Sequence, residues 1–189
     1  MNPVTHFLTG WLIANVDYLE RRDRAIVTLA AVIPDADGLG ILTGIASKEQ
    51  LTGLDLYGQY HHVLAHNVFF GLLLAAAGYA LSKKKGLAIF LVLISYHVHL
   101  LGDLLSGRGP DGTIWTISYL YPALAEIQFS WSDQWELNAW PNVVITAAAL
   151  LLTLYLAWRR GFSPVNIISV KADSAVVATL RSRFPGQRE

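Results

Sequence analysis

The chain has 189 residues, enough for one domain with a sizeable core, and 53% of them are hydrophobic. Charged residues make up only 15%, whereas about 25% is usual in a soluble domain. The formal net charge is zero, so we expect no nucleic acid partner. There is no cysteine, which excludes disulfides and leaves histidine and carboxylate as the strong metal ligands. The composition predicts a protein whose surface is largely in contact with lipid.

The N-terminal third contains two apolar stretches and a mixed segment. Residues 3–19 are mostly apolar and stop at the charged run 20–24, and residues 25–33 form a second run that is too short to span a membrane alone. The first stretch lacks a basic start and a small-residue cleavage site, so we do not expect a removed signal peptide. Residues 38–60 are rich in glycine and predict a loop.

Three later runs are predicted to cross the membrane: residues 63–81, 86–105 and 141–158. At about 1.5 Å per residue, runs of this length approach a hydrocarbon core about 30 Å thick. The segment 106–139 between the last two is polar and contains tryptophan and tyrosine, which is typical of an interfacial loop.

These runs predict an all-α integral membrane helical bundle with about four membrane-embedded segments. We expect residues 1–160 to form the membrane-embedded domain and residues 161–189 to form a polar tail, with a short helix over 172–184.

Three basic clusters suggest a topology, because cytoplasmic loops are enriched in lysine and arginine. The clusters lie at residues 21–24, 83–85 and 159–160. Placing all three in the cytoplasm brings one set of polar residues to the outer ends of the apolar runs: His6, Asp35, Asp37, His61, His62, His66, His99 and Asp103. Ionisable groups at membrane depth are costly and are by default functional candidates. Loop charge and ligand position therefore favour one site on the extracytoplasmic side of the inner (plasma) membrane.

Histidine and aspartate pairs recur at helical spacing. His99 and Asp103 are four residues apart and share a face if the segment is helical, which suits a metal ligand pair and an ordinary polar pair equally well. The other candidates at the same depth favour the ligand pair. His62 and His66 are also four apart, whereas His61 and His66 meet one ion only if His61 precedes the helix. His97 lies two residues from His99, on another face, and we expect it to be structural or to hold a ligand in place.

Asp35 and Asp37 follow Pro34 and could bind one metal, bridge two, or supply a ligand and a general base. Taken alone they would be a turn. His6 stands alone near the start, and Gly10 one turn later would let another segment approach closely. The sequence contains no GxSxG, P-loop, GxGxxG or HExxH motif.

Four motifs, in this order, resemble those of the membrane-bound metal-dependent hydrolases, which are also labelled LexA-binding, inner membrane-associated hydrolases. They are Thr5-His6…Gly10, Pro34-Asp35-x-Asp37, His61-x4-His66-Asn67 and His99-x3-Asp103, and the resemblance covers about residues 1–160. The usual HRxxTHS of that family is here HHVLAHN, with His62 in place of the arginine.

The resemblance implies hydrolysis with a divalent metal, Zn²⁺ or Mn²⁺. The expected ligands are His6, Asp35, Asp37, His61, His66, His99 and Asp103. Asp37 and His62 are the candidate catalytic residues, with Asp37 as the base that takes a proton from a metal-activated water. The pattern is similar to that of zinc-dependent phospholipase C and single-strand zinc nucleases, which suggests phosphoester chemistry. A site at headgroup depth predicts a membrane lipid or lipid-like substrate.

Two other classes of function compete with this prediction. A metal transporter or sensor could use the same ligands, although transporters usually bind ions near the membrane midplane. A non-catalytic interaction protein would bind a cytoplasmic protein partner through the tail after Arg160, as the LexA label suggests.

Overall fold

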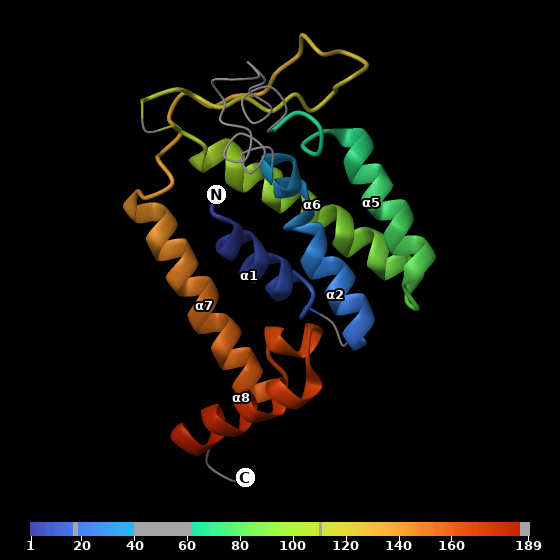
Figure 1. Ribbon diagram of the computed structural model, residues 1–189, viewed down its shortest axis with the longest axis vertical. Coiled ribbons are helices and arrows are strands. Elements are labelled where there is room, and N and C mark those ends of the chain that lie inside the picture. The colour runs from blue at the N-terminus through green and yellow to red at the C-terminus, as the bar shows by residue number, and fades with distance from the viewer. Residues whose placement is uncertain (17–18, 40–61, 110, 186–189) are drawn as a thin grey trace, which may run out of the picture.

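The computed structural model describes residues 1–16, 19–39, 62–109 and 111–185. Within these ranges it is all-α and has no β-strand, only two isolated bridges. Figure 1 shows the arrangement of the six α-helices in this part of the chain. They are α1 (Pro3–Ile13), α2 (Arg21–Ala30), α5 (Val68–Leu81), α6 (Lys85–Ser106), α7 (Trp140–Arg160) and α8 (Val170–Arg183). Two 3₁₀ helices, η1 (Ile33–Leu39) and η2 (Pro164–Ile167), complete the set.

Among the described residues, two helices are long and apolar enough to cross a membrane, α6 with 22 residues and α7 with 21. The third predicted span is α5, which is apolar but has 14 residues, because Asn67 caps the helix and starts it at Val68 rather than at residue 63. At 1.5 Å per residue α5 is about 21 Å long. α1 and α2 have 11 and 10 residues. The structure thus supports two spans, and the expectation of about four is not supported.

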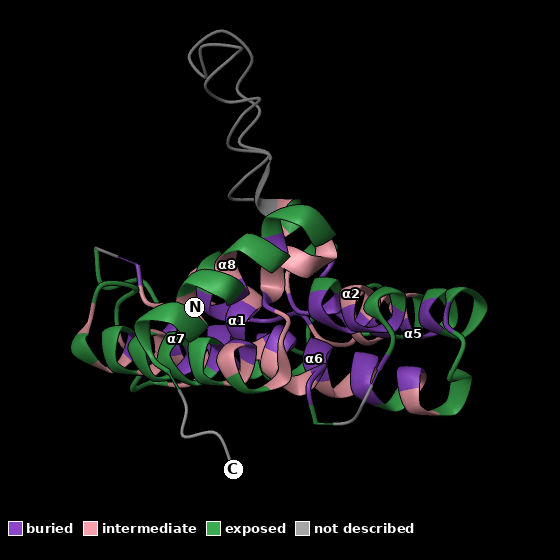
Figure 2. Cartoon of the chain, turned by 90° about the horizontal axis from the view of Figure 1, so that it is seen from below, coloured by how far each residue is buried: buried purple, intermediate pink, exposed green. Residues whose placement is uncertain are grey.

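α6 is the central helix of the bundle. It packs against α5, α2 and α1, and α1 also packs against α2 and α7. Half of the apolar part of α6 is buried inside the molecule, whereas most of α7 is not. In Figure 2 the buried positions lie mainly on the helix sides that face other helices. The largest apolar cluster of the described residues joins α2, α6 and the segment between α1 and α2, through Ala14, Leu19, Val27, Ala30, Leu91 and Val92.

Close helix contacts occur at glycine, as expected at Gly10. A Cβ atom there would lie 2.6 Å from Ala31 Cβ and 2.8 Å from the Thr28 carbonyl oxygen, so α1 rests directly on α2. A Cβ atom at Gly71 in α5 would likewise lie 2.7 Å from the Tyr96 ring of α6. These contacts fix the positions of α1 and α5 relative to α2 and α6.

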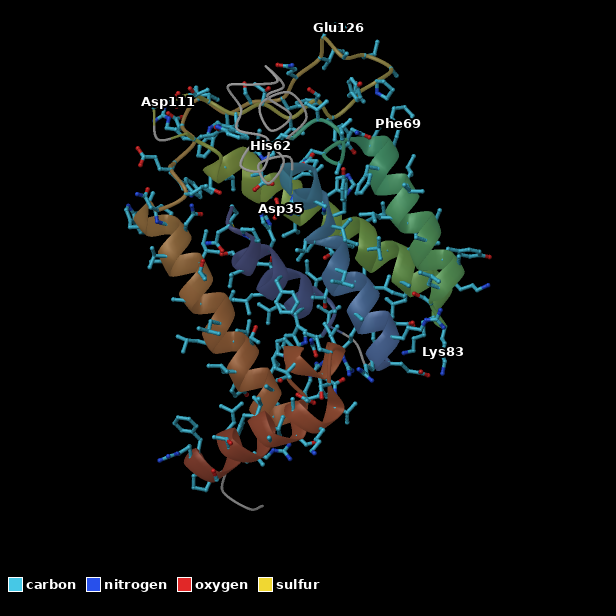
Figure 3. The ribbon with its side chains drawn as sticks, viewed as in Figure 1. Asp35, His62, Phe69, Lys83, Asp111 and Glu126 are labelled. Carbon is cyan, nitrogen blue, oxygen red and sulfur yellow. The ribbon has the colours of Figure 1, made fainter. Side chains whose placement is uncertain are left out.

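The three basic clusters gather at one end of the bundle. Lys83, labelled in Figure 3, forms an ion pair with Glu20 just before α2, at 2.7 Å. Arg21 donates to the carbonyl oxygens of Asn166 and Ile167. The end of α6 and the start of α7 lie at the opposite end, joined by the segment 107–139 (Figure 1).

The predicted short helix in the tail is confirmed as α8. Its Asp173 is buried and accepts hydrogen bonds from the backbone N–H and hydroxyl of Ser163, both at 2.7 Å. Asn166 donates to the other oxygen of Asp173 at 2.8 Å and accepts from Arg24 of α2 at 3.1 Å. The part of the tail that the structure describes is therefore attached to the bundle, and the predicted division at residue 160 stays a prediction.

Candidate metal centre

α6 supplies two of the candidate ligands near its C-terminal end. His99 and Asp103 share a helix face, as their spacing predicts, and His99 Nε2 lies 3.1 Å from Asp103 Oδ2. Both side chains are buried, with exposed fractions of 0% and 3%. A histidine and a carboxylate at such depth need partners, since an isolated buried charge is very costly.

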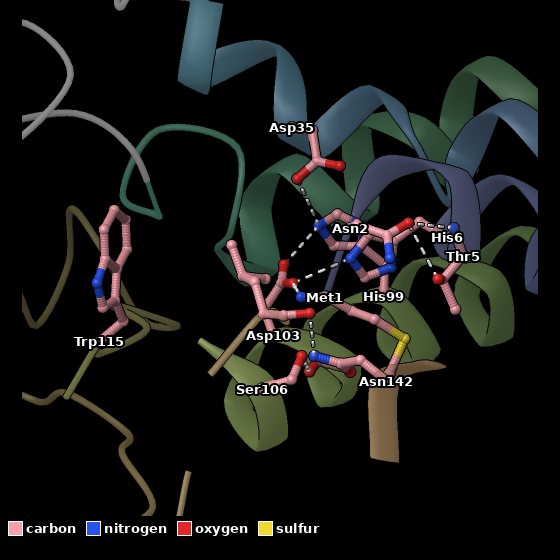
Figure 4. A network of polar contacts seen from close by, with 12 residues as sticks. Met1, Asn2, Thr5, His6, Asp35, His99, Asp103, Ser106, Trp115 and Asn142 are labelled. Carbon is pink, nitrogen blue, oxygen red and sulfur yellow. Dashed lines mark hydrogen bonds and ion pairs between the residues drawn. The ribbon is translucent and has the colours of Figure 1, made fainter. Parts of the chain in front are cut away.

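His6 and Asp35 approach from two other elements, α1 and η1 (Figure 4). His6 Nε2 lies 2.9 Å from Asp103 Oδ1, and Asp35 Oδ1 lies 3.8 Å from His99 Nε2. Gly102 makes room for the His6 ring, because a Cβ atom there would lie 3.1 Å from His6 Cε1. The amino group of Met1 also forms an ion pair with Asp103 Oδ1.

His66 reaches the same place from the segment that precedes α5. Its Nε2 lies 3.0 Å from His99 Nε2 and 3.3 Å from Asp103 Oδ2. This segment is not helical, and α6 holds it: the Tyr96 hydroxyl lies within hydrogen-bond distance of the carbonyl oxygens of Ala65 and Asn67, at 2.9 and 2.7 Å. His66 therefore enters the cluster through a loop clamped to the helix that carries His99.

His62 lies beside His66 with its backbone in the left-handed region, at φ 65°. Its Nε2 is 4.0 Å from Asp103 Oδ2, and its ring centroid is 4.5 Å from that of His66 and 4.8 Å from that of Trp115. The predicted pairing of His62 with His66 is present, but a turn produces it rather than a helix face.

Nδ1 of His99 and Nδ1 of His66 each lie within hydrogen-bond distance of a partner outside the cluster. His99 Nδ1 lies 2.9 Å from the carbonyl oxygen of Ala31, which can only accept, so Nδ1 carries the hydrogen. His66 Nδ1 lies 2.9 Å from Asp37 Oδ2. Both rings thus direct Nε2 toward the cluster, which is how metal-binding histidines are usually oriented.

Two sets of ligand atoms result. In one, atoms of His6, Asp35, His99 and Asp103 lie within 4.8 Å of one another, and in the other, atoms of His62, His66 and Asp103 do so. One oxygen of Asp35 and one of Asp103, both Oδ2, are buried and accept no hydrogen bond of acceptable geometry from the described residues. Buried carboxylate oxygens in this condition fit a site for a cation.

The electrostatics of His66 point the same way. Burial alone would lower its pKa, but the carboxylates of Asp103 and Asp37 outweigh burial and raise that pKa to about 9. The cluster thus attracts positive charge strongly enough to keep a buried imidazole protonated at neutral pH.

The remaining predicted residues lie elsewhere. Asp37 is in neither set, because its Oδ2 faces Nδ1 of His66 rather than the cluster centre. His61 lies outside the described residues. His97 is exposed and contacts the Leu93 carbonyl oxygen and the Tyr119 hydroxyl, at 2.7 and 2.9 Å, which agrees with a structural role.

Sequence reasoning missed two groups that shape the site. Tyr96 precedes His99 by three residues, so helical spacing could have placed it on the same face. The carbonyl oxygen of Ala31 orients His99, and no side-chain pattern could have indicated it.

The fold and the cluster define an all-α protein with candidate membrane spans and a buried histidine–carboxylate site. A family profile described as YdjM inner membrane protein matches residues 1–172, and the chain belongs to this family of inner membrane proteins. Searches of curated proteins and of solved structures found no match.

Proposed function

We propose that this protein is a metal-dependent hydrolase of the inner membrane, with Zn²⁺ or Mn²⁺ held by His6, Asp35, His99 and Asp103. The observation that supports it is the convergence of three buried side chains and the half-buried Asp35 from three separate elements. Burying these ionisable groups together is costly, because each loses its hydration, and a bound divalent cation would add to the compensation that the Met1 amino group and His66 provide. Histidine nitrogen with carboxylate oxygen is a ligand set that both metals accept.

The roles of Asp35 and Asp37 follow from the contacts that each carboxylate already makes. A bound divalent cation would supply a Lewis acid and a water with a pKa near 7. Asp37 is occupied with His66 and with the N–H of Ala65, so it orients a neighbouring ring. Asp35 is the more exposed of the two carboxylates in the first set, at 18% against 3% for Asp103, and its Oδ2 accepts no hydrogen bond from the described residues. We assign the proton-accepting role to Asp35 and a positioning role to Asp37.

The place of the site in the bundle supports a lipid-like phosphoester substrate. His99 and Asp103 lie in the last two turns of α6, next to the segment 107–139, and Trp115 of that segment contacts His62. This is where an apolar helix meets a loop with aromatic residues, as at a membrane–water interface. A substrate at headgroup depth would reach the site without leaving the bilayer. The basic clusters at the opposite end favour an extracytoplasmic position for the site, because cytoplasmic loops are enriched in lysine and arginine.

Metal analysis beside a hydrolysis assay tests the proposal. Purified protein in detergent is loaded with Zn²⁺ or Mn²⁺, its metal content is measured by mass spectrometry, and a panel of phospholipids is assayed for phosphoester hydrolysis. We expect bound metal and hydrolysis in the wild type, and loss of both in His99→Ala. The matched control is His97→Ala, a histidine on the same helix outside the cluster, which should retain both.

Metal binding without hydrolysis, together with metal uptake into vesicles, would replace the hydrolase with a transporter. An equal metal content in the wild type and His99→Ala would overturn the metal site itself.

A further inference from the structure

We propose that the cluster holds two cations that share Asp103, and that His62 completes the second position together with His66. This inference rests on the proposed function but goes beyond it, because the first position needs neither His62 nor His66. It gives a role to the second set of ligand atoms, His62, His66 and Asp103, all three of which are buried.

The two oxygens of Asp103 face different donors. Oδ1 lies 2.9 Å from His6 Nε2. Oδ2 lies 3.1 Å from Nε2 of His99, which belongs to the first set, and 3.3 and 4.0 Å from Nε2 of His66 and His62, which belong to the second. A carboxylate that contacts imidazoles of both sets is suited to bridge two metal ions. Two-metal sites of this kind act on phosphoesters by stabilising both the attacking and the leaving oxygen.

The spacings within the second set are compatible with ligands of one ion. Two ligand atoms of one tetrahedral zinc lie about 3.4 Å apart, because each bond is about 2.0–2.2 Å long. The 3.3 Å between His66 Nε2 and Asp103 Oδ2 agrees with this value. The 4.0 Å between His62 Nε2 and Asp103 Oδ2 is too long for a hydrogen bond, yet it is short enough for one ion to contact both atoms.

The backbone of His62 is a second, independent observation. His62 is the one residue other than glycine with positive φ in the described part of the chain. Such a conformation costs of order 1 kcal/mol, and it clusters at ligand sites. Here it accompanies a buried imidazole that packs against His66, in the non-helical segment that precedes α5.

The test is titration of the metal-free protein with Mn²⁺, followed by electron paramagnetic resonance and metal analysis. We expect about two ions per wild-type chain and a spin-coupled spectrum, because a shared carboxylate couples the two ions. His62→Asn should bind about one ion and give the spectrum of isolated Mn²⁺. Asparagine removes the imidazole but adopts positive φ more readily than other residues, so the turn is retained. His97→Asn is the matched control and should keep the coupled pair.

The outcomes separate this inference from the proposed function. One uncoupled ion in both the wild type and His62→Asn would overturn the second position and leave the first intact. A coupled pair in both would exclude His62 as a ligand. No bound ion in the wild type would overturn the proposed function as well. The coupled spectrum of the wild type tests the pair of ions even if the variant fails to fold.

Discussion

The carboxylate of Asp37 lies beside the His–Asp cluster and holds one of its imidazoles. Its Oδ2 lies 2.9 Å from Nδ1 of His66 and accepts the N–H of Ala65 at 3.2 Å. The side chain is only 2% exposed. Partners of this kind fix the ring orientation and increase the basicity of the nitrogen that faces the metal.

Replacement of this carboxylate by an amide should weaken metal binding without abolishing it. We expect Asp37→Asn to lower the affinity by about 10–100-fold, the usual effect of losing such a partner, as measured by competition with a chelator of known affinity. Asp133→Asn, at an exposed position in the segment 107–139, should leave the affinity unchanged. If Asp37→Asn lost its metal as completely as His99→Ala, Asp37 would be a ligand itself, as the sequence predicted.

At the scale of single residues, the sequence indicates which side chains belong to the His–Asp cluster but not how each one is oriented. His99 and Asp103 follow from helical spacing, and the structure brings His6, Asp35 and His66 to them. The role of Asp37 could not be predicted, because it depends on which face of His66 the η1 segment meets. The pairing of His62 with His66 was expected on a helix, but it depends on a left-handed residue that spacing cannot reveal.

Among the elements, α1 is positioned by its contact with α2 at Gly10. A methyl group there would meet Ala31 Cβ at 2.6 Å and the Thr28 carbonyl oxygen at 2.8 Å, so α1, which carries His6, would have to move. Gly10→Ala should therefore destabilise the protein by about 1–3 kcal/mol and lower its melting temperature in detergent by about 2–12 °C.

Gly86→Ala provides the matched control, since no atom lies within 4 Å of the added methyl group. Alanine favours a helix over glycine by up to about 1 kcal/mol, so this variant should melt at the same temperature as the wild type or slightly higher. Equal melting temperatures for Gly10→Ala and the wild type would show that α1 can shift without cost.

The elements themselves were largely predictable where the apolar run was uninterrupted. The run 141–158 became Trp140–Arg160, and 86–105 became Lys85–Ser106. The run 63–81 lost its first five residues, because the Asn67 side chain accepts the N–H of Phe70 and donates to the carbonyl oxygens of Val63 and Leu64. A local cap outweighed hydropathy, and the same cap keeps His66 out of the helix.

In the whole molecule, the basic clusters and the His–Asp cluster lie at opposite ends of the bundle. Lys83 forms an ion pair with Glu20, Arg21 donates a hydrogen bond to η2, and Arg160 lies 3.5 Å from Asn15. Three basic clusters that are distant in sequence therefore share one end of the bundle. The His–Asp cluster lies at the end where α6 finishes. A bundle with this asymmetry should insert with the basic end in the cytoplasm, because translocating lysine and arginine is unfavourable.

Single cysteines can test this orientation, since the natural chain has none. Ser132 is exposed in the segment 107–139, and Ser182 is exposed on α8 at the basic end. In spheroplasts a membrane-impermeant maleimide should label Ser132→Cys, and it should label Ser182→Cys only after the membrane is permeabilised. Labelling in the reverse order would place the cluster in the cytoplasm, where its substrate could not be a lipid of the outer leaflet. Labelling of both without permeabilisation would mean that α7, which joins the two positions, does not cross the membrane.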